Sequence, residues 1–388
     1  MVTVADQLSV VAEAAPREWK QPLPYSESRL HQLAPYIGKL KPFIARQLLR
    51  QFTAPRDIVL DCFSGSGTIP LEALLLGRRV LAFDTNPYAV TLTRAKLEAP
   101  DCLESANQRL LERLAAAQRR SRYVNEEIPD WVRKFFHPET LQNALRFADE
   151  CLEKDDQFLL ACLLSILHHQ RPGFLSYPSS HLVPYLRDRN FPRGDYPEMY
   201  AERTLAPRLA AKLRRTYKDS CSVSQAGVME VGQVGIADLR LDCMVDAIVT
   251  SPPYMNALDY IRDNRLRMWF LDRRTSDYSP EPTDKQDQFD AITAAFARNA
   301  LRYLREGGHC ILIVGETVLR KRMISHPAER IYDKLFLEYP TLRVEQVIQD
   351  EIPDVRRSRR TGSATKRELI LVLKKGGACL SPLKGAAV

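Results

Sequence analysis

A glycine-rich segment beginning at Asp61 has the composition of a ligand-binding turn. It reads Asp-Cys-Phe-Ser-Gly-Ser-Gly-Thr over residues 61–68 and follows a short apolar run that begins at Asp57. Two glycines two residues apart let the backbone turn sharply, and they let a ligand approach without meeting a Cβ atom. The third glycine of a dinucleotide-binding turn is missing. Asp84 ends the next apolar run, 17 residues after Gly67, where a carboxylate can accept both hydroxyls of a ribose. Together, the glycine-rich segment and Asp84 predict a binding site for a ribose-containing ligand. The alternative is a structural turn and a surface aspartate.

A second candidate site, Ser251-Pro252-Pro253-Tyr254, directly follows the apolar run 246–249. Two successive prolines fix φ at both positions and remove two N–H donors, so the carbonyl groups of this loop are held rigidly. The serine hydroxyl and a proline carbonyl then form a rigid set of acceptors beside an aromatic face. Such a set could hold a planar ring that bears an amino group, although the same four residues also occur in ordinary loops.

Together these motifs resemble those of the S-adenosylmethionine-dependent DNA amino-methyltransferases, which modify N4 of cytosine or N6 of adenine. Residues 61–67 resemble their cofactor loop, although Cys62 stands where the usual form has proline. Asp84 resembles their ribose-binding acid, and residues 251–254 resemble their catalytic tetrapeptide.

The resemblance implies S-adenosylmethionine as the cofactor, and it covers roughly residues 30–95 and 230–375. Residues 38–43 resemble, less specifically, the segment that covers the methionine end of the cofactor, and Asp238 resembles the acid that contacts the adenine amino group. The implied cofactor-binding residues are Lys41, Pro42, Asp61, Phe63, Ser64, Gly65, Gly67, Thr68, Asp84, Asn86 and Asp238. The implied catalytic residues are Ser251, Pro252, Pro253 and Tyr254, and no metal ligand is implied.

The mechanism implied by the family follows from the chemistry of an aryl amine. Its lone pair is delocalised into the ring, so the nitrogen is a poor nucleophile until acceptors on its hydrogens stabilise the developing positive charge. Ser251 and the Pro252 carbonyl would act in this way, most strongly in the transition state. A paired base must be flipped out of the duplex, and Tyr254 would replace its lost stacking. Methylation at C5 of cytosine is disfavoured, because the chain has no Pro-Cys dipeptide.

The target base is predicted from two signals that disagree. A tetrapeptide that begins with serine is typical of N4-cytosine enzymes, whereas a cofactor loop placed before the tetrapeptide, with a long insertion between them, is typical of N6-adenine enzymes. We favour cytosine, because Ser251 lies in the site itself. One alternative is an RNA N2-guanine methyltransferase. Such enzymes usually carry an RNA-binding domain before the core, and we expect the roughly 30 residues that precede the core here to be too few for that domain. Another is a catalytically inactive methyltransferase-like module that binds nucleic acid.

The order of apolar runs predicts an α/β fold that positions these motifs. Residues 57–61, a helix over 69–76 and residues 79–84 form a βαβ unit, which is right-handed with parallel strands. Strands are also expected over 246–250 and 309–314. Two further strands, over 342–349 and 366–373, could pair as an antiparallel hairpin. With the resemblance, this predicts a Rossmann-like methyltransferase sheet, mostly parallel with a C-terminal antiparallel hairpin and a large helical insertion.

The domain organisation follows from where helical spacing replaces these runs. We expect a loose N-terminal arm over 1–25, a methyltransferase domain over 26–95 and 230–376, a helical insertion over 96–229 and a flexible tail over 377–388. Within the insertion, helical spacing is found over residues 97–120, 139–154, 157–169 and 202–217.

Composition indicates a soluble protein without a metal or disulfide framework. Apolar residues make up 45% and charged residues 27% of the 388 positions. The longest apolar stretch, near Phe158, is about ten residues where a membrane span needs about 20, so we expect a cytoplasmic protein without membrane contact. Eight cysteines without a C-x-x-C pair are expected to be reduced and largely buried.

The net charge of +8 is concentrated in two stretches. Residues 351–388 carry 9 basic and 3 acidic side chains, and residues 171–220 carry 10 and 5. A basic face can bind a polyanion, with solvated helix faces as the alternative, and the resemblance implies double-stranded DNA as the partner. Phosphate-binding candidates are Arg356, Arg357, Arg359 and Arg360, with a solvated loop as the alternative. The candidate target-reading residues of the insertion are Trp131, Phe135, Phe136, Arg171, Phe174, Tyr177, Arg187, Arg189 and Arg193. A cognate restriction endonuclease and the oligomeric state stay open.

Overall fold

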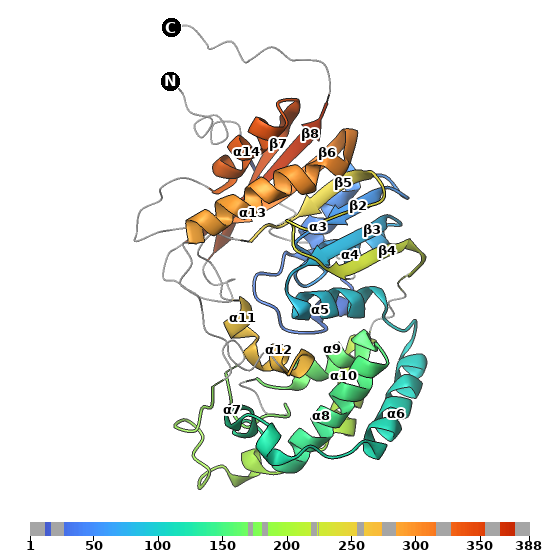
Figure 1. The fold of residues 1–388 in the computed structure, drawn as a ribbon, viewed down its shortest axis with the longest axis vertical. Coiled ribbons are helices and arrows are strands. Elements are labelled where there is room, and N and C mark those ends of the chain that lie inside the picture. Colours follow the sequence, from blue (N-terminus) through green and yellow to red (C-terminus); the bar gives the residue numbers. More distant parts are fainter. Residues whose placement is uncertain are drawn as a thin grey trace, which may run out of the picture.

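One mixed eight-stranded sheet forms the centre of the molecule (Figure 1). The computed structural model describes residues 12–16, 27–169, 174–180, 185–218, 223, 225–253, 260–273, 285–315, 327–353 and 365–376. The strands lie in the order β1-β7-β8-β6-β5-β2-β3-β4. Their bounds are β1 Glu13–Ala14, β2 Ile58–Asp61, β3 Arg79–Asp84, β4 Val228–Gln233, β5 Val245–Thr250, β6 Leu304–Gly315, β7 Leu342–Pro353 and β8 Thr365–Lys375.

The direction of the strands confirms the predicted fold class. β2 pairs in parallel with β3 and β5, and the outer pairs β3–β4 and β5–β6 are also parallel. β8 runs antiparallel to both β6 and β7, which is the C-terminal hairpin that the sequence predicts. The chain moves outward from β2 to β4 and then returns to place β5 on the other side of β2. This reversal is a topological switch point, the place where open α/β sheets bind ligands.

Side chains of each strand alternate between the two faces of the sheet, as period-2 geometry requires. Val59 and Ala247 belong to the core on one face, and Leu60 and Ile248 to the core on the other. The first face is covered by α3 (Pro42–Phe52), α4 (Thr68–Leu75) and α5 (Pro87–Leu97), and the second by α13 (Lys285–Asn299) and α14 (Pro327–Glu338) (Figure 1).

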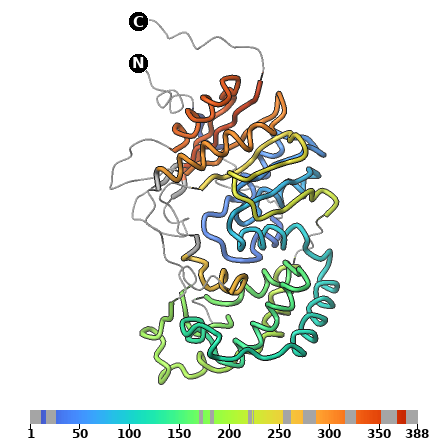
Figure 2. Tube along the Cα trace, in the orientation of Figure 1, coloured from blue at the N-terminus to red at the C-terminus, as the bar shows by residue number. Residues whose placement is uncertain are grey.

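A helical region lies beyond α5 and shares its hydrophobic core (Figure 2). Its helices are α6 Leu103–Arg119, α7 Asp130–Arg133, α8 Pro138–Glu153, α9 Gln157–Ile166 and α10 Leu205–Thr216, together with the later helices α11 Tyr260–Asp263 and α12 Arg265–Leu271. Phe147, Leu159 and Leu209 of this region are fully buried in the same cluster as Leu48 and Val59 of the sheet unit. The helices and this face of the sheet are therefore stabilised together.

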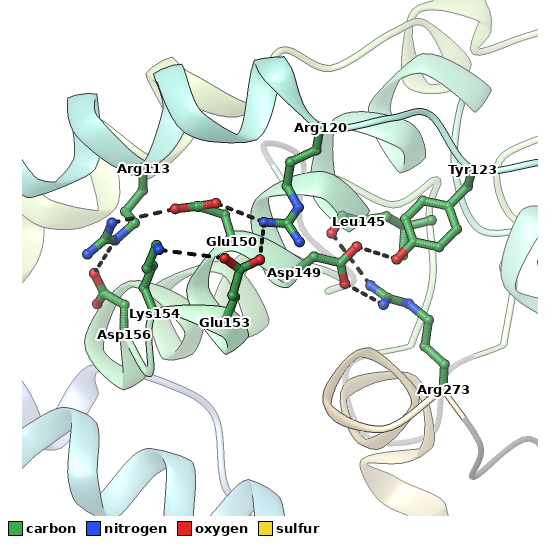
Figure 3. A network of polar contacts seen from close by, with 10 residues as sticks. All are labelled: Arg113, Arg120, Tyr123, Leu145, Asp149, Glu150, Glu153, Lys154, Asp156 and Arg273. Carbon is green, nitrogen blue, oxygen red and sulfur yellow. Dashed lines mark hydrogen bonds and ion pairs between the residues drawn. The ribbon is translucent and has the colours of Figure 1, made fainter.

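A network of ion pairs crosses the outer helices (Figure 3). Arg113 of α6 and Arg120, the residue directly after α6, reach Glu150 of α8, at 3.5 and 2.9 Å. Asp149, the neighbour of Glu150, accepts hydrogen bonds from Tyr123 and from Arg273, a residue just past α12. Each arginine in this network is partly exposed, whereas the Glu150 side chain is 5% and the Asp149 side chain 18% exposed. These carboxylates therefore depend on the arginines for a partner charge. Through Arg273, the network fixes the chain that follows the tetrapeptide against the helical region.

The prediction of a loose N-terminal arm is wrong at residues 13 and 14. Glu13–Ala14 form β1, which pairs in parallel with Ile348 and Gln349 of β7, and the Ala15 N–H donates to the Gln349 carbonyl at 2.8 Å. An open sheet edge can bind a strand through main-chain hydrogen bonds alone, so a segment made mostly of alanine gave no signal.

Two predicted boundaries also differ from the structure. The helix expected over residues 97–120 is α6, which begins at Leu103, because Leu97 ends α5 and Pro100 lies between the two helices. β4 begins at Val228, inside the span predicted to be helical insertion. Along the described ranges, no helix is long and apolar enough to cross a membrane.

Because the helices and the sheet share a core, we predict that a destabilising substitution in the helices also lowers the stability of the sheet. Leu159→Ala in α9 should lower the free energy of unfolding by about 2–5 kcal/mol, because it leaves a cavity in that core. Urea denaturation measures the loss, and hydrogen exchange of the β2 amides should accelerate by the same free energy. Leu111→Ala on the exposed side of α6, where Leu111 is 63% exposed, is the control and should change neither quantity. Faster exchange confined to the helices would contradict a common core.

Candidate functional site

The glycine-rich loop leaves β2 at the switch point and adopts a left-handed backbone at both glycines. Gly65 has φ +50° and Gly67 has φ +71°. A Cβ atom on Gly67 would lie 2.8 Å from the Thr93 Cα atom of α5, so no other residue fits there without moving the helix. The Gly67 N–H donates to the Ser64 carbonyl at 2.8 Å, which closes the turn directly before α4. The sequence prediction of a tight turn here is correct.

Three hydroxyl side chains of the loop point into the protein. Ser64, Ser66 and Thr68 are buried. Ser64 Oγ accepts from the Thr93 hydroxyl at 3.2 Å, and the oxygens of Ser66 and Thr68 lie 3.1 Å apart. These side chains brace the loop from inside, so the loop can offer a ligand its main chain. Ser64 and Thr68, expected at the cofactor, contribute through this bracing.

Asp84 joins the end of β3 to the glycine-rich loop. Its Oδ2 accepts from the Gly65 N–H at 2.8 Å, and its Oδ1 accepts from the Asn86 N–H at 2.9 Å. Burial raises the pKa of this carboxyl group, and the main-chain donors oppose that rise. A carboxylate has about four acceptor positions, so both oxygens keep capacity for ribose hydroxyls. Asn86 is itself the N-cap of α5, where its side chain accepts from the Tyr88 N–H at 2.9 Å.

Asp61 and Thr250 join the two candidate loops. Both residues are buried, and they end the adjacent parallel strands β2 and β5. The Thr250 hydroxyl donates to Asp61 Oδ1 at 2.6 Å, and the Phe63 N–H lies 3.3 Å from that carboxylate oxygen and 3.2 Å from Thr250 Oγ1. Burial raises the pKa of Asp61 to about 7, against the lowering effect of these donors. Sequence analysis found Asp61 but missed Thr250, whose only signal was its place directly before Ser251.

The tetrapeptide begins beside this junction. The Ser251 hydroxyl donates to the Ile313 carbonyl of β6 at 3.1 Å. A hydroxyl group has one proton and two lone pairs, so this oxygen can take part in further hydrogen bonds only as an acceptor. Pro252 is buried and Pro253 is half-buried. Tyr254 lies outside the described residues.

An apolar pocket adjoins the tetrapeptide on the side of α13 and α14. Phe63 stacks on Phe296 of α13, with ring centroids 6.1 Å apart. The pocket is lined by Phe63, Pro252, Pro253, Phe289, Ile292, Thr293, Phe296, Leu312 and Ile331.

The segment before α3 contacts the loop through Tyr36. A Cβ atom on Gly65 would lie 3.4 Å from Tyr36 Cε1, which places that ring directly against the loop. Lys41 instead pairs with Asp350 of β7 at 3.3 Å, and Pro42 begins α3. The aromatic contact was missed, because nothing in the spacing of residues 38–43 points back to Tyr36.

Asp238 lies in the loop after β4, next to the loop that follows Asp84. A Cβ atom on Gly235 would lie 3.4 Å from the Thr85 methyl group and 3.8 Å from Asp238 Oδ2. Asn299 of α13 donates to the carbonyl groups of Ile236 and Ala237, at 3.0 and 2.8 Å, and so holds this loop. Asp238 is exposed.

The candidate target-reading residues divide into two groups. Phe135 and Phe136 are buried in the core shared with the sheet, and their interpretation as readers is wrong. Arg193 lies over the rings of Tyr177 and Tyr200, 5.1 and 4.7 Å from their centroids, and Arg189 is exposed. Arg171, another candidate reader, lies outside the described residues. So do the four candidate phosphate-binding residues, Arg356, Arg357, Arg359 and Arg360.

The raised pKa of Asp61 predicts how the stability of the protein depends on pH. Its pKa in the folded protein, about 7, lies above the ordinary value of 3.8, so between these values the folded state binds more protons than the unfolded state. The Asp61 contribution should therefore weaken folding as pH rises from about 4 to 7. Chemical denaturation across this range should give a falling difference in stability between the wild type and Asp61→Asn, which cannot ionise. A difference that is constant with pH would contradict the raised pKa.

Comparison with known proteins supports the sequence motifs. Residues 29–95 match the family model described as DNA methylase. The Type II methyltransferase M.MjaII of Methanocaldococcus jannaschii is 26% identical over 98 residues, which are 25% of this chain and 18% of that relative.

Solved structures give low similarity over a larger part of the chain. TrmN from Thermus thermophilus is 16% identical, with a TM-score of 0.37, over 90% of this chain and 53% of that one. TehB from Haemophilus influenzae is 9% identical, with a TM-score of 0.31, over 86% and 62%. The sequence matches confirm the resemblance of this chain to the S-adenosylmethionine-dependent DNA amino-methyltransferases, and with it the expected cofactor.

Proposed function

We propose that the protein transfers a methyl group from S-adenosylmethionine to the exocyclic amine of a base flipped out of double-stranded DNA. The observation that carries this proposal is the position of Ser251. Its hydroxyl lies where β5 ends, beside the loop that leaves β2, and its proton is committed to the Ile313 carbonyl. The oxygen is therefore an acceptor for an amine N–H at the edge of the sheet where the cofactor loop also lies.

The residues around the glycine-rich loop fit the cofactor. Gly65 and Gly67 have left-handed backbones, the hydroxyl groups of the loop are turned inward, and Tyr36 lies against Gly65, so a ligand meets main chain and an aromatic ring. Asp84 stands at the next strand end with acceptor capacity for a ribose. When bound, S-adenosylmethionine supplies a methyl group activated by a sulfonium charge.

The residues of the chain would then prepare the amine. Ser251 and the Pro252 carbonyl accept its N–H groups, and these hydrogen bonds strengthen as positive charge develops on the nitrogen. The Asp61–Thr250 hydrogen bond fixes the distance between the two loops, because a misplacement of about 1 Å between the reacting groups is costly. Tyr254 stacks on the flipped base.

We favour N4 of cytosine over N6 of adenine as the target. The first residue of the tetrapeptide is a neutral hydroxyl, Ser251, where an aspartate would favour adenine. The helical region, predicted as residues 96–229, is the proposed reader of the target sequence, with Arg189 and Arg193 as its exposed candidates. Arg356, Arg357, Arg359 and Arg360 are proposed to bind phosphates.

The proposed function is tested by identifying the product. The protein should be incubated with S-adenosylmethionine and either duplex DNA or RNA, and the digested nucleosides should be identified by mass spectrometry. N4-methylcytosine in DNA is the expected product. N6-methyladenine would change the target base, and N2-methylguanine in RNA would change the class of substrate. Cofactor binding with no methylated product would support the catalytically inactive alternative.

Ser251→Ala should slow methyl transfer without weakening the binding of the cofactor. The lost hydrogen bond to a developing charge corresponds to about 1.5–3 kcal/mol, or roughly 10- to 150-fold in single-turnover rate. Isothermal titration with S-adenosylhomocysteine should give nearly the wild-type affinity.

A matched control separates catalysis from the loss of a structural hydrogen bond. Ser165 is buried, whereas Ser251 is half-buried, and the Ser165 hydroxyl donates to the Cys162 carbonyl at 2.7 Å. Ser165→Ala therefore removes a hydrogen bond from a serine hydroxyl to a main-chain carbonyl, within α9. This variant should lose a similar amount of thermal stability and keep its rate. Full activity in folded Ser251→Ala would remove this residue from the catalytic site.

Asp84→Ala should weaken cofactor binding by about 1.5–3 kcal/mol, the scale of hydrogen bonds to a charged group. Titration calorimetry with S-adenosylhomocysteine measures the change. Asp246→Ala is the control, because Asp246 accepts from the Ile58 N–H at 2.8 Å at the opposite end of these strands. Equal affinities for the two variants would exclude a ribose contact by Asp84.

A further inference from the structure

The turn that carries Tyr36 onto the glycine-rich loop is held by side chains from several elements. This turn, residues 29–36, begins with the short helix η1 (Arg29–Gln32) and is referred to below as the η1 turn. Leu30, Leu33 and Ala34 bury its apolar side. His31 hydrogen-bonds to Glu72 of α4 at 2.8 Å, and burial lowers the pKa of His31 to about 4, so this histidine is neutral at pH 7.

The carbonyl groups of the η1 turn are capped one after another. The Lys39 ammonium donates to the carbonyl groups of His31, at 3.1 Å, and Ala34. The Tyr88 hydroxyl of α5 donates to the Pro35 carbonyl at 3.0 Å. Because these groups sit in a largely buried turn, each would lose its hydration without gaining a partner if the donor were removed.

One of the caps comes from the helical region. Lys212 of α10 is buried, and its ammonium donates to the Gln32 carbonyl at 3.2 Å. α10 packs directly against η1. Burial lowers the pKa of Lys212 to about 8, and burial, with the charge of Lys212 next, lowers the pKa of Lys39 to about 8. The charge of one ammonium group therefore acts on the other through the interior of the protein.

We infer that Lys212 is a positioning residue for the cofactor site, so that the helical region completes this site as well as facing the nucleic acid. The inference rests on the proposed function, because it takes Tyr36 and the glycine-rich loop as the place of the cofactor. Lys212 holds the Gln32 carbonyl, the η1 turn carries Tyr36, and Tyr36 lies against Gly65. Without the hydrogen bond from Lys212, the η1 turn would hold Tyr36 less firmly against Gly65. The part of the cofactor that faces this turn would then bind more weakly.

The resemblance assigns the segment after this turn to the methionine end of the cofactor, which gives a selective test. S-adenosylhomocysteine contains that end, and 5′-methylthioadenosine lacks it while keeping the adenosine and the sulfur. Titration calorimetry of Lys212→Met with both compounds should show S-adenosylhomocysteine binding weakened by roughly 3- to 10-fold, the effect of one lost capping hydrogen bond. Binding of 5′-methylthioadenosine should change less than about twofold, and Lys212→Arg, which keeps a donor, should recover most of the lost affinity.

Lys375→Met is the matched control. Lys375 is also buried, and its ammonium caps the Leu301 and Leu304 carbonyl groups, at 3.0 and 2.6 Å, at the end of β8. This variant should lose thermal stability and keep its affinity for both compounds. If Lys212→Met does not fold, Lys212→Gln, with a shorter neutral donor, is measured in its place.

The possible results separate two failures. Equal weakening of both compounds, or unchanged affinity for S-adenosylhomocysteine in the folded variant, would overturn the role of Lys212 and leave the proposed function intact. Wild-type protein that binds neither compound would overturn the proposed function itself.

Discussion

The hydrogen bond between the Thr250 hydroxyl and the Asp61 carboxyl group is the contact on which the candidate site depends. It joins the last residues of β5 and β2 at the point where the strand order reverses. Helices cover both faces of the sheet and exclude water there, and burial raises the pKa of Asp61 as a result. In such a low-dielectric interior a satisfied hydrogen bond is strong and an unsatisfied one is costly. The separation of the glycine-rich loop from Ser251 is therefore fixed by the core beneath it.

Local chemistry explains what the sequence could predict. The glycine-rich turn follows from two glycines in left-handed conformation, and the hairpin of β7 and β8 from two apolar runs close together in the chain. The sequence could not predict where long side chains end. Lys41 was expected at the cofactor, but its ammonium reaches Asp350, which is 309 positions away in the chain. Such pairings are set by the assembled sheet and leave no periodic trace.

In the helical region, the sequence also failed to predict which side chains are buried. Aromatic residues such as Phe135 and Phe136 are of the type that nucleic-acid-binding surfaces use, yet both are buried in the core, where Phe136 packs against Phe270 of α12. Composition alone does not distinguish an aromatic side chain that binds a base from one that fills a core. β1 was missed for a related reason, since its pairing with β7 uses main-chain atoms that every sequence has.

A helical region with a separate core could bind DNA without any effect on the cofactor loop. Here Phe147, Leu159 and Leu209 share a core with the sheet, Arg273 ties the chain after the tetrapeptide to α8, and Lys212 caps the turn over Gly65. Closely packed cores transmit small displacements, because their side chains have few voids to move into. A displacement of α8 or α10 by bound DNA would therefore reach both candidate loops. In this fold, the proposed recognition of the target and the proposed positioning of the cofactor would depend on the same set of contacts.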